Sequence, residues 1–475
     1  MAFVAASSAF AGGLLTNTNQ NAAFVRNFAQ EGKIDITSIY TNPAGGAFLE
    51  NGWHLSLNMQ TAFQQRNIET TFPLFKMNTH DPNATRLFEG KATAPVVPSF
   101  TVSYNRDKWS LSAHFAINGG GGKCEFDKGI GSFEAAYAGM IVQKMQTPGV
   151  LTGLLTQGLM AKGYDVATAS ALAATGQFKG YSLNSYMKGR SYYFGLQLGG
   201  TYKILDNLSA YVGIRALYAT CNYNGYVNPS VAYSLTTPEG PVDNTQALNN
   251  YGIEMNCDQT GFGVSPIIGV DWKINKHWNV STKYEFRTKL NLKNKSQIDI
   301  ADAGVMEKAA PILGQFEDGK KVREDSPALF AFGAEYSPIE KVRIDAAYHQ
   351  FFDKCSKKYG DKQNLIDHNT HEFILGAEWD ICKLITVSGS WEITRYGLSE
   401  AYMNDLSYAL SNNMVGAGVR INATKRMSID LGYMCTFYND RQVTTEVTTP
   451  TATLLKKDIY SRKNHTFGIG VNLDL

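Results

Sequence analysis

The stretch HWNVSTKYEFRTKLNLK, residues 277–293, decides the fold class. Its even-numbered positions, from Trp278 to Leu292, are apolar or aromatic apart from two threonines, whereas its odd-numbered positions carry His277 and every charged residue. A period of two places successive side chains on opposite faces of a β-strand. The stretch therefore predicts one long strand with an apolar face and a polar face.

The same period recurs along the rest of the chain and predicts fourteen strands. They cover residues 52–65, 95–106, 108–120, 188–204, 207–223, 260–274, 277–292, 326–337, 340–353, 369–381, 383–395, 411–423, 426–440 and 461–475. Short links such as Asn275-Lys276 alternate with long ones, of which residues 121–187 are the longest. Tight turns and long loops are therefore expected at opposite ends of one antiparallel sheet.

Composition excludes several classes of protein. The chain has 475 residues, of which 44% are hydrophobic and 18% charged, with a formal net charge of +2. This balance is too apolar for a disordered chain and too nearly neutral for a protein that binds nucleic acid by neutralising phosphates. No apolar run reaches the roughly 18 residues that a membrane-spanning helix needs.

Alternation alone fits a soluble barrel with apolar side chains inside as well as a membrane barrel with apolar side chains outside. Three features favour the membrane barrel: the turns segregate by length, many segments run longer than ordinary strands, and aromatic residues lie near the strand ends. These aromatic residues are Trp53, Tyr104, Trp109, Trp272, Trp278, Trp379 and Trp391. The prediction is an all-β protein, a fourteen-stranded antiparallel transmembrane β-barrel built from residues 52–475.

The segments without alternation have other predicted roles. Residues 1–11 end in the small-x-small triplet Ala9-Phe10-Ala11 and resemble the remnant of a secretory signal, although an apolar tail would look similar. Residues 12–51 show no strand pattern and are long enough to fold into the lumen as a hatch. Residues 121–187 predict a helical extracellular insertion, with helices over 133–144 and 150–174; another helix is expected over 301–313.

The six cysteines show no metal-ligand spacing, and the sequence predicts neither a metal site nor a cofactor. Cys221 and Cys257 flank one predicted loop. In an exported chain they would either form a disulfide or remain free thiols, and the sequence leaves both possibilities open.

With its strands, hatch and insertion placed, the chain resembles the outer-membrane long-chain fatty-acid transporters, the FadL-like family. The stretch GGLLTNTNQNAAFVRNFAQEG, residues 12–32, resembles the opening of that family's hatch, and Asn42-Pro43-Ala44-Gly45 resembles the Asn-Pro-Ala motif that ends it. The terminal Leu475 departs from the aromatic residue with which such barrels often finish. The resemblance implies a monomer in the outer membrane of a Gram-negative bacterium, inserted by the barrel-assembly machinery and surrounded by outer-membrane lipid.

The resemblance also implies a function, the passive uptake of a hydrophobic small-molecule ligand such as a long-chain fatty acid. In the family, a groove in the extracellular loops leads to a lumen pocket above the hatch, and a bend in strand three opens sideways to lipid. Matching apolar candidates for the groove are Phe133, Met140, Met145, Leu154, Leu155, Leu159 and Met160, which would otherwise pack helix on helix. Candidates for the lateral opening are Asn118, Gly119, Gly120, Gly121 and Gly122, because glycines weaken a strand; a flexible hinge is the alternative.

A carboxylate head group would need a cation in the lumen. Inward parity selects five cations, Arg215, Lys283, Arg287, Arg343 and Arg420. Arg215, Lys283 and Arg287 are the candidates for the head group, but acidic residues on the same face would neutralise many such cations across the strands. The hatch charges Arg26, Glu31 and Asp35 are expected to pair with the barrel wall, since buried charges need partners.

Two other classes remain as alternatives, an outer-membrane lipid hydrolase and a structural or adhesin barrel. The sequence shows no GxSxG elbow, HExxH motif or phosphate-binding loop, so a protein that is not an enzyme is predicted. The chemical identity of the substrate depends on the shape of the pocket, which the sequence does not supply.

Overall fold

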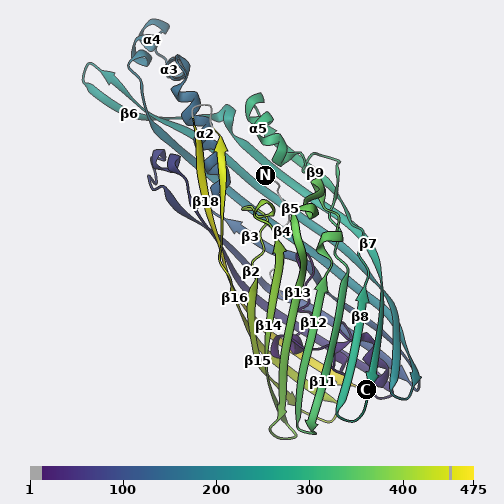
Figure 1. Cartoon of the computed structure of the whole chain (residues 1–475). Coiled ribbons are helices and arrows are strands. Elements are labelled where there is room, and N and C mark those ends of the chain that lie inside the picture. Colours follow the sequence, from purple (N-terminus) through teal and green to yellow (C-terminus); the bar gives the residue numbers. More distant parts are fainter. Residues whose placement is uncertain (1–12, 449–451) are drawn as a thin grey trace.

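Fourteen antiparallel strands close into one barrel in the computed structural model, which describes residues 13–448 and 452–475 (Figure 1). In ring order they are β1 (Gly52–Thr71), β2 (Thr85–Arg106), β3 (Trp109–Phe126), β4 (Gln177–Leu205), β5 (Leu208–Thr237), β7 (Ile253–Lys273), β8 (Trp278–Glu285), β11 (Leu329–Ile339), β12 (Val342–Phe351), β13 (Ile366–Asp380), β14 (Ile385–Leu398), β15 (Asn412–Asn422), β16 (Met427–Tyr438) and β18 (Thr453–Asp474). β18 pairs with β1 and closes the ring. The predicted fold class is confirmed, and the proposed signal remnant lies outside the described residues.

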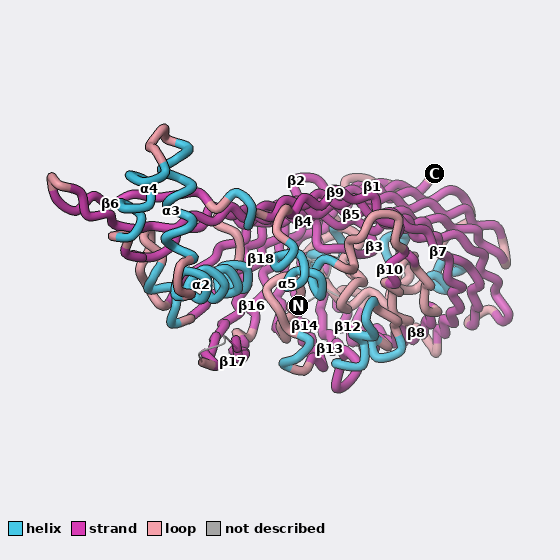
Figure 2. Tube along the Cα trace, turned by 90° about the horizontal axis from the view of Figure 1, so that it is seen from above, coloured by secondary structure: helices cyan, strands magenta, loops and turns pink. Residues whose placement is uncertain are grey.

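Additional strands and helices gather at the long-loop end of the barrel. β6 (Gly240–Ala247), β9 (Asn291–Ile300), β10 (Lys321–Arg323) and β17 (Arg441–Thr448) extend the wall, and the helices are α2 (Gly131–Gln146), α3 (Val150–Ala161), α4 (Val166–Ala174) and α5 (Ala303–Leu313). The helical part of the insertion is shorter than 121–187, because β3 continues to Phe126 and β4 begins at Gln177. The helix expected over 150–174 is two helices, separated near Gly163, whose φ is +95°. From above, α3, α4 and β6 project sideways beyond the ring (Figure 2).

An apolar belt surrounds the outside of the barrel, as β7 illustrates. Its outward side chains between Phe262 and Trp272 are apolar and exposed, whereas those nearer the loops, such as Asn256 and Asp258, are polar. These eleven residues match the roughly 9–11 that a tilted strand needs to cross a bilayer. A closed barrel with such a belt is a membrane-spanning barrel of the outer-membrane type. Among helices of the described residues, none combines the length and apolarity that a membrane crossing requires.

The strand predicted over 277–292 is interrupted, which corrects the opening prediction. β8 ends at Glu285, and β9, which begins at Asn291, pairs with the same neighbour, β7. Ile267 and Thr260 of β7 are seven positions apart, whereas their partners Glu285 and Lys293 are eight positions apart. The extra residue forms a bulge that reverses the faces of the strand. Leu290 and Leu292 therefore point inward, while Lys289, Lys293 and Lys295 are exposed.

The hatch fills the short-turn half of the lumen, where it is drawn in purple in Figure 1. It contains α1 (Ala22–Arg26) and the short 3₁₀ helices η1 (Ile36–Ser38) and η2 (Pro43–Phe48). The predicted ion pairs with the wall are confirmed: Arg26 bonds Glu378 and Asp430 at 2.7 Å each, Glu31 bonds His349 at 2.7 Å, and Asp35 bonds Arg420 at 2.5 Å.

The Asn42-Pro43-Ala44-Gly45 segment attaches the end of the hatch to the wall. The Asn42 side chain accepts a hydrogen bond from the Gly45 N–H, while Pro43 occupies the first turn of η2, where its missing N–H costs nothing. Thr201 and Ser209 of β4 and β5 donate to the Pro43 and Ala44 carbonyls, at 3.0 and 2.7 Å. The motif therefore has a structural role, which is to fasten the end of the hatch to β4 and β5.

Cys221 and Cys257 are both free thiols, so the possible disulfide is not present. They lie on the neighbouring strands β5 and β7 rather than beside a loop. Cys221 faces Gln259 and Cys257 faces Tyr223, which leaves the two thiols out of register. The Cys221 Sγ instead lies 3.3 Å from the Ser191 hydroxyl.

Candidate transport pathway

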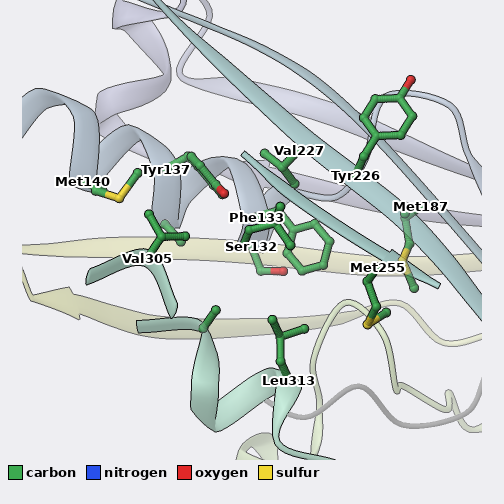
Figure 3. Close-up of a pocket in the computed structure, with 14 residues that line it drawn as sticks. Ser132, Phe133, Tyr137, Met140, Met187, Tyr226, Val227, Met255, Val305 and Leu313 are labelled. Atoms are coloured by element: carbon green, nitrogen blue, oxygen red, sulfur yellow. The ribbon is translucent and has the colours of Figure 1, made fainter. Parts of the chain in front are cut away.

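An apolar pocket opens at the long-loop end of the barrel, between α2, α5 and the upper parts of β4, β5 and β7 (Figure 3). Its lining residues are Ser132, Phe133, Ala136, Tyr137, Met140, Met187, Gly225, Tyr226, Val227, Ile253, Met255, Val305, Ala309 and Leu313. They surround about 780 Å³ of space not filled by protein, part of it open to solvent. The apolar lining is typical of a site for a small hydrophobic molecule.

Two of the seven loop residues proposed from the sequence, Phe133 and Met140, line this pocket. Met145, Leu155 and Leu159 are instead buried within the apolar interior, and Leu154 packs against it. Met160 is 44% exposed at the far end of α3. The helix-on-helix interpretation therefore describes α3 better than the groove interpretation does.

The strand residues of the pocket were missed by the sequence analysis. Met187, Tyr226, Val227 and Met255 lie beyond the limits predicted for their strands, at 188, 223 and 260. The contribution of α5 had a detectable signal, because Val305, Ala309 and Leu313 repeat every fourth residue and form one apolar stripe.

A single cluster of buried apolar side chains connects the pocket with the interior of the barrel. Tyr137, Met140 and Met255 of the pocket belong to it, as do Leu15 of the hatch and Tyr402 of the β14–β15 loop. The cluster thus forms a continuous set of apolar contacts from the pocket to Leu15 of the hatch.

The wall is irregular where β3 passes this cluster. The pairing of β2 with β3 stops at Lys91 and Glu125 and resumes at Phe100 and Phe115. Over this interval the alternation of β3 also stops, since all seven residues from Ala116 to Gly122 are buried. Gly120 and Gly122 have φ values of +90° and +67°, which glycine adopts without strain. Asn118 and the four glycines thus form an inward bend within a strand that continues to Phe126.

The N-terminal end of the hatch, around Leu15 and Asn17, rests directly on this bend and is called the hatch tail below. The Asn17 N–H donates to the Asn118 carbonyl at 2.8 Å, and the Asn17 side chain donates to the Ile117 carbonyl at 3.0 Å. A Cβ atom at Gly119 would lie 1.9 Å from the Leu15 carbonyl oxygen, so only glycine permits this close approach. Any displacement of the tail therefore changes the packing at the irregular part of the wall.

The three cations proposed for a head group do not form one site. Arg215 is bound to Glu285 at 2.6 Å and lies 4.5 Å from the ring centre of Tyr40 in the hatch. Lys283 donates to the Tyr40 carbonyl at 2.7 Å. Arg287 lies beyond the end of β8, where it donates to the Cys355 carbonyl at 2.6 Å. Arg215 is thus paired with an acid of the wall, as the pairing alternative expected, and both Arg215 and Lys283 contact Tyr40 of the hatch.

Tyr40 supports the same conclusion. Burial raises the pKa of the Tyr40 phenol to about 12, even though the nearby Arg215 acts in the opposite direction. The phenol is therefore neutral at physiological pH, and its ring offers Arg215 and Lys283 a cation–π contact between hatch and wall.

Comparison with solved structures identifies the fold. The chain superimposes on a Pseudomonas aeruginosa FadL homologue with a TM-score of 0.64 and 14% identity, covering 98% of this chain and 100% of that one. The fold is that of the FadL homologue. The resemblance drawn from the sequence is thus confirmed for the fold.

Two toluene transporters are also similar in structure. TodX of P. putida has a TM-score of 0.52 and 12% identity, over 100% of this chain and 99% of that one. TbuX of Ralstonia pickettii has a TM-score of 0.54 and 11% identity, over 95% and 99%. No family model and no curated protein matches the sequence.

Proposed function

We propose that the protein is an outer-membrane channel for the passive uptake of hydrophobic molecules, including long-chain fatty acids. The observation that carries this proposal is the apolar cluster that leads from the loop pocket to the irregular part of β3. The shared fold supports a channel, because the similar structures are a FadL homologue and toluene transporters rather than enzymes. The preference for fatty acids rests on the sequence resemblance.

The route follows from the geometry. A hydrophobic ligand enters the pocket between α2 and α5 and moves inward along the apolar cluster to Leu15. Displacement of the hatch tail then frees the bend at Gly119, and the ligand leaves between β2 and β3 into the surrounding lipid. Each step exchanges apolar surroundings for apolar surroundings, so the concentration gradient suffices as the driving force.

Filling the interval between β2 and β3 tests this route. Ala94 and Val97 of β2, Ala62 of β1 and Ile117 of β3 pack together there. Ala94→Trp places a large ring in the interval, and we expect uptake of radiolabelled hexadecanoic acid to fall at least about tenfold in Gram-negative cells lacking a channel of their own. Gly119 is a poorer position, because its substitution would also displace the hatch tail.

The matched control is Val264→Trp, which adds the same ring to the lipid-facing surface of β7. Heat-modifiable migration on gels shows for both variants whether the barrel has assembled. If an assembled Ala94→Trp barrel takes up hexadecanoic acid at the wild-type rate, the lateral route is wrong. If the unmodified protein gives no uptake of any hydrophobic probe, the proposed function itself is wrong.

A further inference from the structure

A group of positively charged side chains lies on the outer face of the barrel, where the wall continues beyond the bulge after Glu285. Lys289 and Lys293 of the β9 region and Lys321 of β10 are all exposed. β9 and β10 are neighbouring antiparallel strands, in which Lys293 faces Lys321 directly. Opposed residues of such a pair point to the same side of the sheet. We call these three lysines the basic patch.

The pairing of Lys293 with Lys321 is unfavourable for the protein alone, because like charges directly opposite each other destabilise a sheet. Neither lysine forms an ion pair with an acid within residues 13–448 and 452–475. Thr260, which faces Lys293 from β7, is uncharged. An anion bound between the two ammonium groups would relieve their repulsion through charge-assisted hydrogen bonds.

The nearest acid does not neutralise the patch. By the register of β9 and β10, Asp325 lies opposite Lys289. Asp325 is buried, however, and its carboxylate pairs with Arg323 at 2.5 Å and with Arg287 at 3.5 Å. These two arginines already outnumber the acid, so the basic patch adds to an excess of positive charge.

The basic patch has an acidic boundary on its loop side. Lys295 faces Asp258 of β7, and farther along the same pair of strands Asp299 faces Glu254. The excess of positive charge is thus confined to the part of this outer face that lies nearest the apolar belt.

Aromatic side chains border the basic patch on its short-turn side. Phe286 is 42% exposed, and its ring meets that of Tyr284 edge to face, with 4.8 Å between the ring centres. Tyr284 also contacts Phe352, at 6.0 Å, and Phe262 on β7 is exposed. Aromatic residues of a membrane barrel gather where hydrocarbon meets the polar head groups. The basic patch, which follows directly on the long-loop side, is therefore placed among the head groups of the outer leaflet.

We propose that the basic patch binds the phosphate group of a lipid in the outer leaflet, with the acyl chains of that lipid along Phe262 and Phe286. Lysine suits this position, because its long stem covers apolar surface while its ammonium meets the phosphate. The outer leaflet of a Gram-negative outer membrane contains phosphorylated glycolipids, which have both parts. The proposal concerns the outer surface of the barrel and does not depend on what the lumen transports.

The test uses an acylated glucosamine disaccharide with one phosphate group and the same molecule without phosphate. The patch variant combines Lys289→Gln, Lys293→Gln and Lys321→Gln. Native mass spectrometry of the purified barrel in neutral detergent gives the dissociation constants. We expect the constant for the phosphorylated lipid to rise about fivefold for each lysine replaced, while that for the unphosphorylated lipid stays within about twofold. Added salt should weaken phosphorylated-lipid binding more in the wild type than in the patch variant, because exposed charges are screened.

The matched control combines Lys276→Gln, Lys341→Gln and Lys383→Gln, which removes the same charge from exposed positions in three short turns at the opposite end. The control should bind both lipids like the wild type. Equal losses in the two triple variants would show a response to net charge alone and would overturn the proposal. An equal loss for both lipids in the patch variant, or no loss for either, would overturn it as well.

Thermal unfolding provides a second measurement. Without lipid, the patch variant should melt at or above the temperature of the wild type, since a repulsive pair is removed. The phosphorylated lipid should raise the melting temperature of the wild type and the control more than that of the patch variant, because a ligand of the folded state stabilises it. Equal stabilisation of all three proteins would place the lipid elsewhere. If heat-modifiable migration shows that the patch variant does not assemble, Lys293→Gln alone provides the same comparisons.

Discussion

The two halves of the lumen are filled in different ways. The short-turn half holds the hatch by buried charges, such as Arg26 with Glu378 and Asp430, whereas the long-loop half contains one large apolar cluster together with buried charges such as Arg66, Asp405 and Asp458. Buried ion pairs are sensitive to geometry and hold a plug in one position. Apolar contacts lack direction and allow a ligand to slide. Under the proposed function, the short-turn half stays closed and the long-loop half conducts the ligand.

The largest effect on hatch docking is expected when Arg26 is replaced. Arg26 is 2% exposed, and Arg26→Met leaves Glu378 and Asp430 without one partner each, which should cost about 3–5 kcal/mol of hatch docking. Conductance of the barrel in planar lipid bilayers should rise, because a displaced hatch admits ions. Arg343→Met is the control: Arg343 also bonds Glu378, at 3.0 Å, but is partly exposed and should cost far less. Equal conductance in both variants would contradict the comparison.

An intermediate effect is expected in the apolar half. Leu155 of α3 is 1% exposed within the cluster, and Leu155→Ala should destabilise the α3–α4 region by about 2–4 kcal/mol. Limited proteolysis should then cleave this region while the barrel remains folded. Met160→Ala on the same helix removes an exposed side chain and should not change the cleavage rate. Increased ion conductance in Leu155→Ala would show that the two halves are coupled more tightly than their chemistry implies.

The smallest effect concerns acid. Burial alone would raise the pKa of the Asp35 carboxyl, but the charge and hydrogen bond of Arg420 outweigh burial and hold that pKa well below its usual range. Because the folded-state pKa is lowered, the pair stabilises the hatch above the unfolded value of about 4, and this contribution is lost as the pH falls below that value. Asp35→Asn keeps the N-cap of η1 and should cost about 1 kcal/mol at pH 7, discounted for partial exposure.

The pH dependence of hatch release supplies the measurement. Conductance of the wild type and of Asp35→Asn should differ at pH 7 and converge in acid, where Asp35 is protonated in both folded and unfolded states. A constant difference down to the lowest pH at which the barrel survives would mean that the Asp35 charge does not hold the hatch.

Alternation in the sequence predicted the strands and their two faces, while turn length, strand length and the position of the aromatic residues favoured the membrane barrel over a soluble one. The hatch was located by its lack of alternation. Its charges Arg26, Glu31 and Asp35 were expected to pair with the wall, because a segment inside the lumen buries them and buried charges need partners. Both inferences depend on local pattern and on the cost of burying charge, which the sequence displays directly.

The remaining features depend on register and on distant neighbours. The one-residue bulge after Glu285 reverses a strand face and displaces Arg287 from the other two cations, although its sequence still alternates. The strand residues of the pocket lie on extensions that continue beyond the predicted limits. None of these features has a local signal, because each depends on how one strand is aligned with its neighbours, which the alternation of a single strand does not fix.

The bulge after Glu285 also marks a change in the outer surface of this strand. On the short-turn side of the bulge, Tyr284 and Phe286 face outward; on its loop side, the outward side chains are Lys289, Lys293 and Lys295. A single inserted residue thus ends the apolar outer face of this strand. The bulge therefore marks the height at which, on this strand, an apolar outer surface gives way to a basic one.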